Sequence, residues 1–166
     1  MISIFKNINK FVGKSEMLDA LGVFCAIYLM PFMVFYLFLF AFNLNKLEVF
    51  FYPVTAGLFG AFVINKIIYV FYKEKRPAEL ESTKTLILVP KNPSFPSRHA
   101  SLVFGISFCL FFYDIPLAIT FLICSCFVGV GRVFCGVHWF RDIVAGVFVG
   151  FISALTIYNL LNYILQ

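Results

Sequence analysis

The sequence predicts an all-α membrane protein, a polytopic bundle of five transmembrane helices, or six helices if an N-terminal interfacial helix is counted. Of the 166 residues, 62% are hydrophobic and 13% are charged, whereas soluble domains carry about 45–50% apolar and about 25% charged residues. Several apolar runs approach or exceed the length of about 20 residues that a helix needs to cross a bilayer. The charged residues gather between these runs. We therefore expect residues 1–166 to form one membrane-embedded domain.

The first 20 residues intersperse charged and apolar side chains. Lys6, Lys10 and Lys14 alternate with Ile, Phe and Val residues, a pattern typical of a short amphipathic helix that lies on a membrane surface. No small-residue cleavage site follows an apolar run, so a secretory signal peptide is not expected. A frayed, solvated lead-in is the alternative interpretation of residues 1–20.

Five apolar runs follow, and they occupy residues 21–42, 49–72, 100–113, 115–131 and 143–166. The second run contains one charged residue, Lys66, and the others contain none. The third run is the shortest, and it lengthens if its helix begins near Pro96, because proline suits the first turn of a helix. A tight turn from Tyr113 to Pro116 joins the third and fourth runs.

The basic residues are distributed unequally between the two sides of the membrane. Five spans place the N-terminal segment and the connections 73–99 and 132–142 on one side. Lys46 is the only basic residue on the other side. Such clustering is typical of a cytoplasmic face or of a site for an anionic substrate, and both interpretations stay open at this point.

Three polar stretches on the basic side hold nearly all the reactive side chains. Both histidines of the chain, His99 and His138, fall within them. Histidine exchanges protons near neutral pH, and it can attack phosphorus to form a covalent intermediate. Asp142 lies four residues after His138, about one helical turn, so its carboxylate can accept a proton from the ring and fix the tautomer.

The same stretches contain side chains that suit an anion. Arg76, Arg98 and Arg132 carry planar guanidinium groups that bind phosphate in bidentate fashion. Ser97 precedes the third span, where it is a natural N-cap, and a capped helix N-terminus offers backbone N–H groups to an anion. Each residue alone has an ordinary interpretation as a membrane anchor or a helix cap. Their conjunction on one face is what favours a phosphate site.

These stretches resemble the type-2 phosphatidic acid phosphatase superfamily of membrane lipid phosphatases. The family pattern is Lys, six residues and Arg-Pro; then Pro-Ser-Gly-His; then Ser-Arg, five residues, His, three residues and Asp. This chain matches the pattern at Arg76-Pro77, at Pro96-Ser97-Arg98-His99, and at Arg132, His138 and Asp142. The short chain and its second motif are most similar to bacterial undecaprenyl diphosphatases of the bacitracin-resistance type.

The resemblance implies a role for each matching residue. His138 would be the nucleophile that forms a phosphohistidine, and Asp142 would orient its ring. His99 would protonate the leaving oxygen and then activate a water. The phosphate oxygens would be held by Arg76, Ser97, Arg98 and Arg132. No metal or other cofactor is expected, and a magnesium site among Glu74, Glu79 and Glu81 is the alternative.

Two positions depart from the family pattern. Gly131 stands where the third motif usually has Ser, and Tyr69 stands where the first motif has Lys, seven residues before Arg76. Lys66 and Lys73 share a helical face with Tyr69, and either could supply the missing ammonium group. Lys73 is favoured for phosphate binding because it lies nearer the polar boundary, while a membrane-interface anchor is the alternative role for Lys73.

The function that the resemblance implies is that of a metal-independent lipid phosphatase or diphosphatase. The first expectation is hydrolysis of undecaprenyl diphosphate to undecaprenyl phosphate, a step of cell-envelope lipid metabolism and peptidoglycan biosynthesis. Phosphatidylglycerol phosphate and the 1-phosphate of lipid A are alternative substrates. A small transporter subunit is the non-enzyme alternative, although transport pathways usually place polar groups near the bilayer midplane.

The expected partners are the bilayer and a phospholipid or polyprenyl lipid substrate, and no nucleic acid is expected. The sequence leaves the oligomeric state open.

The resemblance implies a multi-pass protein of the bacterial plasma (inner) membrane with its active site on the extracytoplasmic face. The clustered basic residues favour the cytoplasmic face instead. Several of them are candidate site residues, so we expect the extracytoplasmic face.

Overall fold

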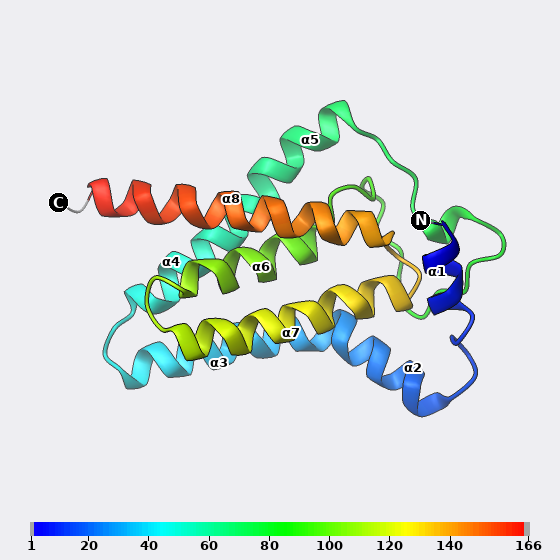
Figure 1. Cartoon of the computed structure of the whole chain (residues 1–166), viewed down its shortest axis with the longest axis horizontal. Coiled ribbons are helices and arrows are strands. Elements are labelled where there is room, and N and C mark those ends of the chain that lie inside the picture. Colours follow the sequence, from blue (N-terminus) through cyan, green and yellow to red (C-terminus); the bar gives the residue numbers. More distant parts are fainter. Residues whose placement is uncertain (1, 165–166) are drawn as a thin grey trace.

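The computed structural model describes the backbone of residues 2–164 and the side chains from residue 5 onward (Figure 1). Its α-helices are α1 (Ile2–Asn9), α2 (Glu16–Val23), α3 (Leu29–Asn43), α4 (Glu48–Leu58), α5 (Asn65–Phe71), α6 (Arg98–Leu110), α7 (Ile115–Phe134) and α8 (Phe140–Ile164). The π-helical segments η1 (Phe24–Tyr28) and η2 (Phe59–Ile64) join α2 to α3 and α4 to α5, and η3 (Pro77–Glu79) is a 3-10 turn. Residues 2–164 contain no β-strand, which confirms the all-α prediction.

Four helical segments of the described chain are long and apolar enough to cross a membrane, namely Glu16–Asn43, Glu48–Phe71, Ile115–Phe134 and Phe140–Ile164. The third expected span forms α6, which has 13 residues and is shorter than a lipid-exposed span needs to be. The helix does not extend to Pro96, because Ser97 is its N-cap and Arg98 its first residue. The five-span count is therefore not confirmed, and a crossing by α6 stays a proposal.

Helix α6 lies at the centre of the bundle, in contact with α4, α7 and α8 (Figure 1). Glycines let the backbones approach. A Cβ atom added at Gly150 of α8 would lie 2.6 Å from the Gly105 nitrogen of α6, and one added at Gly105 would lie 2.9 Å from the Gly57 Cα of α4. Small residues commonly mediate helix packing in membranes. Protein surrounds α6, so little of its backbone faces lipid even though the helix is short.

Buried polar side chains pair with one another between the helices. Asn65 Nδ2 donates to Ser101 Oγ at 3.0 Å, and the hydroxyls of Ser107 and Ser125 lie 2.9 Å apart. An unpaired polar group in this interior would be costly, so these bonds help to fix α5, α6 and α7 relative to one another.

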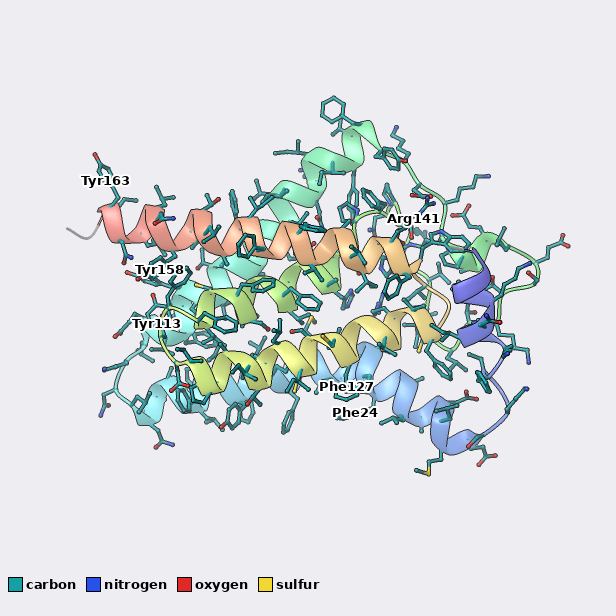
Figure 2. The ribbon with its side chains drawn as sticks, in the orientation of Figure 1. Phe24, Tyr113, Phe127, Arg141, Tyr158 and Tyr163 are labelled. Carbon is teal, nitrogen blue, oxygen red and sulfur yellow. The ribbon has the colours of Figure 1, made fainter. Side chains whose placement is uncertain are left out.

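The outer surface of the bundle is apolar. Phe24 and Phe127 point outward from η1 and α7 (Figure 2) and are exposed. Many other large apolar side chains are exposed on the same helices, far more than a soluble protein presents in contiguous patches. This surface fits a multi-pass membrane protein.

The N-terminal segment differs from the single interfacial helix expected for residues 1–20. Helix α1 ends at Asn9, Gly13 adopts a positive φ of 78°, and residues from Glu16 onward belong to the first span. Phe5 and Val12 are buried against the protein, and the Phe5 ring meets the Trp139 ring edge-on at 5.1 Å between centroids. Helix α1 thus packs on the end of the bundle, and its position on the membrane surface stays a prediction.

Candidate active site

The candidate site residues meet at one end of the bundle, where α6 and α8 begin and α7 ends (Figure 1). Arg141, in the first turn of α8, marks this end in Figure 2, and Tyr113 and Tyr158 mark the other end. The three polar stretches of the sequence, distant along the chain, are thus neighbours in space.

Helix α6 begins at this end with a side-chain cap. Ser97 Oγ accepts a hydrogen bond from the Ala100 N–H at 3.4 Å, and the Ser97 N–H donates to the Asp142 carbonyl at 3.0 Å. The second bond joins the start of α6 to the start of α8. Ser97 is therefore the helix cap that the sequence predicted, and Arg98 and His99 lie in the first turn of α6.

Helix α7 ends in a reversal that requires glycine. Gly136 has a φ of 77°, a left-handed conformation that glycine adopts without steric cost. The N–H groups of Cys135, Gly136 and Val137 donate to the last carbonyls of α7, as in other helix C-caps with glycine. The chain then turns back and places His138 against the start of α8.

Arg132 occupies the last turn of α7 and is buried. Its Nη1 donates to the Ala26 carbonyl of η1 at 3.4 Å, and its Nε is buried with no partner among the described residues. A buried guanidinium with unused donors is costly unless an anion binds there. Its environment therefore fits a phosphate oxygen.

His138 and Asp142 form the pair that their spacing predicted. The His138 ring is almost fully buried, and its Nδ1 lies 3.2 Å from Asp142 Oδ2. The other ring nitrogen, Nε2, lies 3.1 Å from Arg76 Nη1. Because a guanidinium can only donate, Nε2 accepts this bond and the ring proton resides on Nδ1. The free lone pair of the ring thus lies on Nε2, where it accepts the bond from Arg76.

Burial keeps the His138 ring neutral. Loss of hydration lowers the pKa of His138 well below its ordinary value of 6.5, and the positive charges of Arg76 and Arg132 lower it further. A neutral imidazole is the form that acts as a nucleophile. The environment therefore favours the reactive form at neutral pH.

Asp142 is held by more donors than the sequence indicated. Its Oδ2 accepts hydrogen bonds from the Ser94 hydroxyl and from the Trp139 N–H, the latter at 2.9 Å. Its Oδ1 is buried without a partner among the described residues. Sequence reasoning missed Ser94, although it lies in the stretch that precedes the second motif. No signal in the sequence indicates that it faces Asp142.

Arg76 binds the connections together as well as contacting His138. Its guanidinium donates to the carbonyls of Val137 at 2.7 Å, Asn92 at 3.1 Å and Pro93 at 3.2 Å. These acceptors and His138 Nε2 use most of its N–H donors. Phosphate binding by Arg76 would therefore replace one of these bonds.

His99 lies within the same group of charges. Arg132, His138, Arg98 and Arg76 all lie near enough to act electrostatically on its ring. The structure thus brings together both histidines, Asp142 and the three arginines that the sequence singled out, together with Ser97.

Lys73 does not join this group directly. Its side chain is exposed, and it lines a shallow surface pocket together with Arg76 and Lys91. Lys66, the other lysine considered, is also exposed, on α5. Because α5 ends at Phe71 and Tyr72 is extended, Lys73 does not share a helical face with Lys66 and Tyr69, and that expectation was wrong. The contribution of Lys73 to phosphate binding stays a prediction.

Two of the three glutamates considered for magnesium have other partners. Glu74 forms an ion pair with Arg141, and Glu79 Oε1 accepts a hydrogen bond from the Arg76 N–H at 2.9 Å. Within the described part of the chain, no three His, Cys, Asp or Glu side chains lie close enough to hold a metal ion.

Comparison with known proteins gives matches over most of the chain. The family model of the PAP2 superfamily matches residues 48–166. The chain is similar to the bacitracin transport permease protein BcrC of Bacillus licheniformis, with 31% identity over 161 residues, which is 95% of this chain and 78% of the relative. It is also similar to the undecaprenyl-diphosphatase BcrC of Bacillus subtilis (strain 168), with 28% identity over 152 residues, 90% of this chain and 78% of the relative.

Two solved structures share the arrangement of helices. LpxE of Aquifex aeolicus superposes with a TM-score of 0.78 at 23% identity, covering 95% of this chain and 94% of that one. The first transmembrane PAP2 type phosphatidylglycerolphosphate phosphatase from Bacillus subtilis gives a TM-score of 0.60 at 20% identity, covering 98% and 86%. At these identities the likeness shows the fold alone.

Proposed function

The chain belongs to the PAP2 superfamily, and on that premise we propose that residues 1–166 form one membrane-embedded lipid phosphatase that hydrolyses undecaprenyl diphosphate to undecaprenyl phosphate. The observation that carries this proposal is the buried His138–Asp142 pair, in which Nε2 of His138 accepts a hydrogen bond from Arg76 and lies within the positive field of Arg132. The similarity to a protein named undecaprenyl-diphosphatase, over 90% of this chain, supports the diphosphate as the substrate.

In the proposed reaction, Nε2 of His138 attacks the terminal phosphorus in line with the bridging oxygen. The P–O bond to that oxygen breaks and a phosphohistidine forms. His99, which takes up a proton when the negatively charged diphosphate binds beside it, gives that proton to the leaving lipid phosphate. The Asp142 carboxylate offsets the positive charge that develops on the His138 ring. His99 then takes a proton from a water that attacks the phosphohistidine, which frees phosphate and restores the ring.

Fixed positive charge supports this reaction at the phosphate oxygens. Arg132 with its unused buried donors, Arg76, and the N-terminus of α6 capped by Ser97 would hold the equatorial oxygens, where charge must be stabilised in the transition state. We propose that these groups take the place of a metal ion.

Hydrolysis is therefore expected to continue in excess chelator, because guanidinium groups supply the charge. The measurement is phosphate release by the purified protein in detergent, with chelator alone and after magnesium is added back. A loss of activity that magnesium restores would contradict this prediction and would implicate Glu74, Glu79 or Glu81.

Lys73→Ala is expected to lower kcat/KM by roughly 10- to 150-fold if Lys73 replaces the family lysine, because a charge-assisted contact contributes about 1.5–3 kcal/mol. Lys66→Ala, which removes the exposed lysine of α5, is the matched control and should stay near wild type. A larger effect at Lys66 would place the pocket deeper in the membrane, and no effect at either lysine would refute the role of Lys73.

The substrate is tested by assaying the purified protein in parallel against undecaprenyl diphosphate, phosphatidylglycerol phosphate and the 1-phosphate of lipid A. We expect the highest kcat/KM for undecaprenyl diphosphate. A preference for phosphatidylglycerol phosphate, the substrate in the name of one structural neighbour, would overturn the proposed substrate and leave the phosphatase chemistry standing.

A transport function is the second candidate, because one relative is named a permease. The distribution of charge favours the enzyme, since the ionisable site residues lie at one end of the bundle. The buried polar groups of its middle are neutral and pair with one another, as Asn65 does with Ser101 and Ser107 with Ser125. Release of phosphate by purified protein in detergent, without any gradient, would distinguish the enzyme from a transporter.

We propose the bacterial inner membrane as the location, with the active site on the extracytoplasmic face. Helix α8 runs from the site to the opposite end of the bundle (Figure 1), so a reporter fused to the C-terminus should lie in the cytoplasm. If a reporter that works only outside the cytoplasm is active when fused to the C-terminus, the orientation is the reverse of the one proposed.

A further inference from the structure

Arg98 stands where the family's second motif most often has glycine, and its guanidinium has a defined position. Its Nη2 donates to Asn92 Oδ1 at 2.6 Å. Its Cζ lies 5.8 Å from the centroid of the Phe62 ring, within the range of a cation–π contact. The side chain is therefore held at two points rather than extended into solvent.

Asn92 joins Arg98 to the nucleophile. While its side chain binds Arg98, its backbone carbonyl accepts a hydrogen bond from Arg76 Nε at 3.1 Å. Arg76 in turn contacts Nε2 of His138 at 3.1 Å. Hydrogen bonds thus link His138 to Arg76, Arg76 to Asn92, and Asn92 to Arg98. The two guanidinium groups form a row that leads away from His138.

Tyr69 supports this row from the position of the missing family lysine. Its hydroxyl donates to the Pro96 carbonyl at 2.8 Å and accepts a hydrogen bond from Asn92 Nδ2 at 3.5 Å. Tyr69 therefore contributes no charge, but it orients the amide that holds Arg98.

The outer end of the row faces the membrane. Phe62 belongs to η2, inside the second span, and 54% of its surface is exposed. A lipid diphosphate has its hydrocarbon chain in the bilayer, so its lipid-linked phosphoryl group lies on the membrane side and its terminal phosphoryl group points into the protein. The row has the same direction, with Arg98 on the membrane side and His138 inside the protein.

We propose that Arg98 binds the lipid-linked phosphoryl group of a diphosphate and so makes the site selective for lipid diphosphates over lipid monophosphates. This inference rests on the proposed function. When the bridging oxygen leaves with the lipid phosphate, Arg98 offsets the negative charge that this leaving group gains, while the terminal phosphoryl group passes to His138. When the substrate is a lipid monophosphate, the leaving group is the lipid alcohol, which has no phosphoryl oxygens for Arg98 to bind.

The test is Arg98→Gln, assayed with farnesyl diphosphate and farnesyl monophosphate. Glutamine keeps an N–H donor for Asn92 Oδ1 and removes the charge. We expect kcat/KM for the diphosphate to fall roughly 10- to 150-fold, and that for the monophosphate to stay within about threefold, which also shows that the variant is folded. Where monophosphate turnover is too slow to measure, the inhibition constants of inorganic diphosphate and inorganic phosphate supply the same comparison.

Lys91→Gln is the matched control, because Lys91 is an exposed cation next to Asn92 on the same connection. It should keep the wild-type ratio between the two substrates. An equal loss on both substrates in Arg98→Gln, or no loss on either, would overturn the role of Arg98. A wild-type protein that hydrolyses no lipid phosphate would instead refute the proposed function itself.

Discussion

His138→Ala is expected to leave less than about a hundredth of the wild-type kcat/KM, because a covalent nucleophile has no substitute in the site. The ring is buried and bonded to Asp142 and Arg76, so alanine also removes packing and one of the hydrogen bonds that Asp142 accepts. His138→Gln, which keeps bulk and polarity, separates loss of chemistry from loss of folding.

The measurement combines steady-state phosphate release with trapping of the intermediate. Wild-type protein quenched during turnover of labelled substrate should carry a phosphate bond that is stable to base and labile to acid, as expected of phosphohistidine. Both His138 variants should lack this label. A folded variant that keeps more than about a hundredth of the activity would exclude His138 as the nucleophile.

Asp142→Asn is expected to lower kcat by about 10²- to 10⁴-fold with a much smaller change in KM. Asparagine retains one oxygen that can accept the His138 Nδ1 proton, but it lacks the charge that stabilises the cationic ring formed during attack. An interaction that strengthens only in the transition state affects kcat rather than ground-state binding.

Ser94→Ala provides the control for Asp142. It removes the hydroxyl that donates to Asp142 Oδ2 but leaves the carboxylate, its charge and its bond from the Trp139 N–H in place. We therefore expect a loss of roughly tenfold, at the lower end of the about 1.5–3 kcal/mol that a hydrogen bond to a charged group contributes. If folded Asp142→Asn retained activity within tenfold of wild type, the carboxylate would have no electrostatic role.

The parts of the molecule that sequence could predict are those that depend on spacing. His138 and Asp142 are one helical turn apart, and the structure shows the hydrogen bond that this spacing predicts. The family resemblance, which rests on motif spacing, is confirmed by the match over residues 48–166. The helical architecture was predictable because apolar runs of about 20 residues have few alternatives in a membrane.

The parts that sequence could not predict depend on tertiary contacts of the irregular connection between α5 and α6. Asn92 and Ser94 lie in a segment without helical or strand periodicity, so no pattern indicates which way their side chains point. The bond from Arg76 to His138 joins residues 62 positions apart. Whether α6 is a fifth span could not be judged from hydropathy, which does not reveal that the surrounding helices cover this short helix.

The hydrogen bond from Arg76 to Nε2 of His138 has a consequence for the timing of reactivity. A neutral imidazole held ready for attack would react with any small electrophile that reached it. Here the lone pair is occupied until the guanidinium finds a stronger acceptor, and a phosphate dianion is such an acceptor. In the proposed mechanism, binding and activation are therefore one event, and His138 becomes nucleophilic only when a phosphoryl group is beside it.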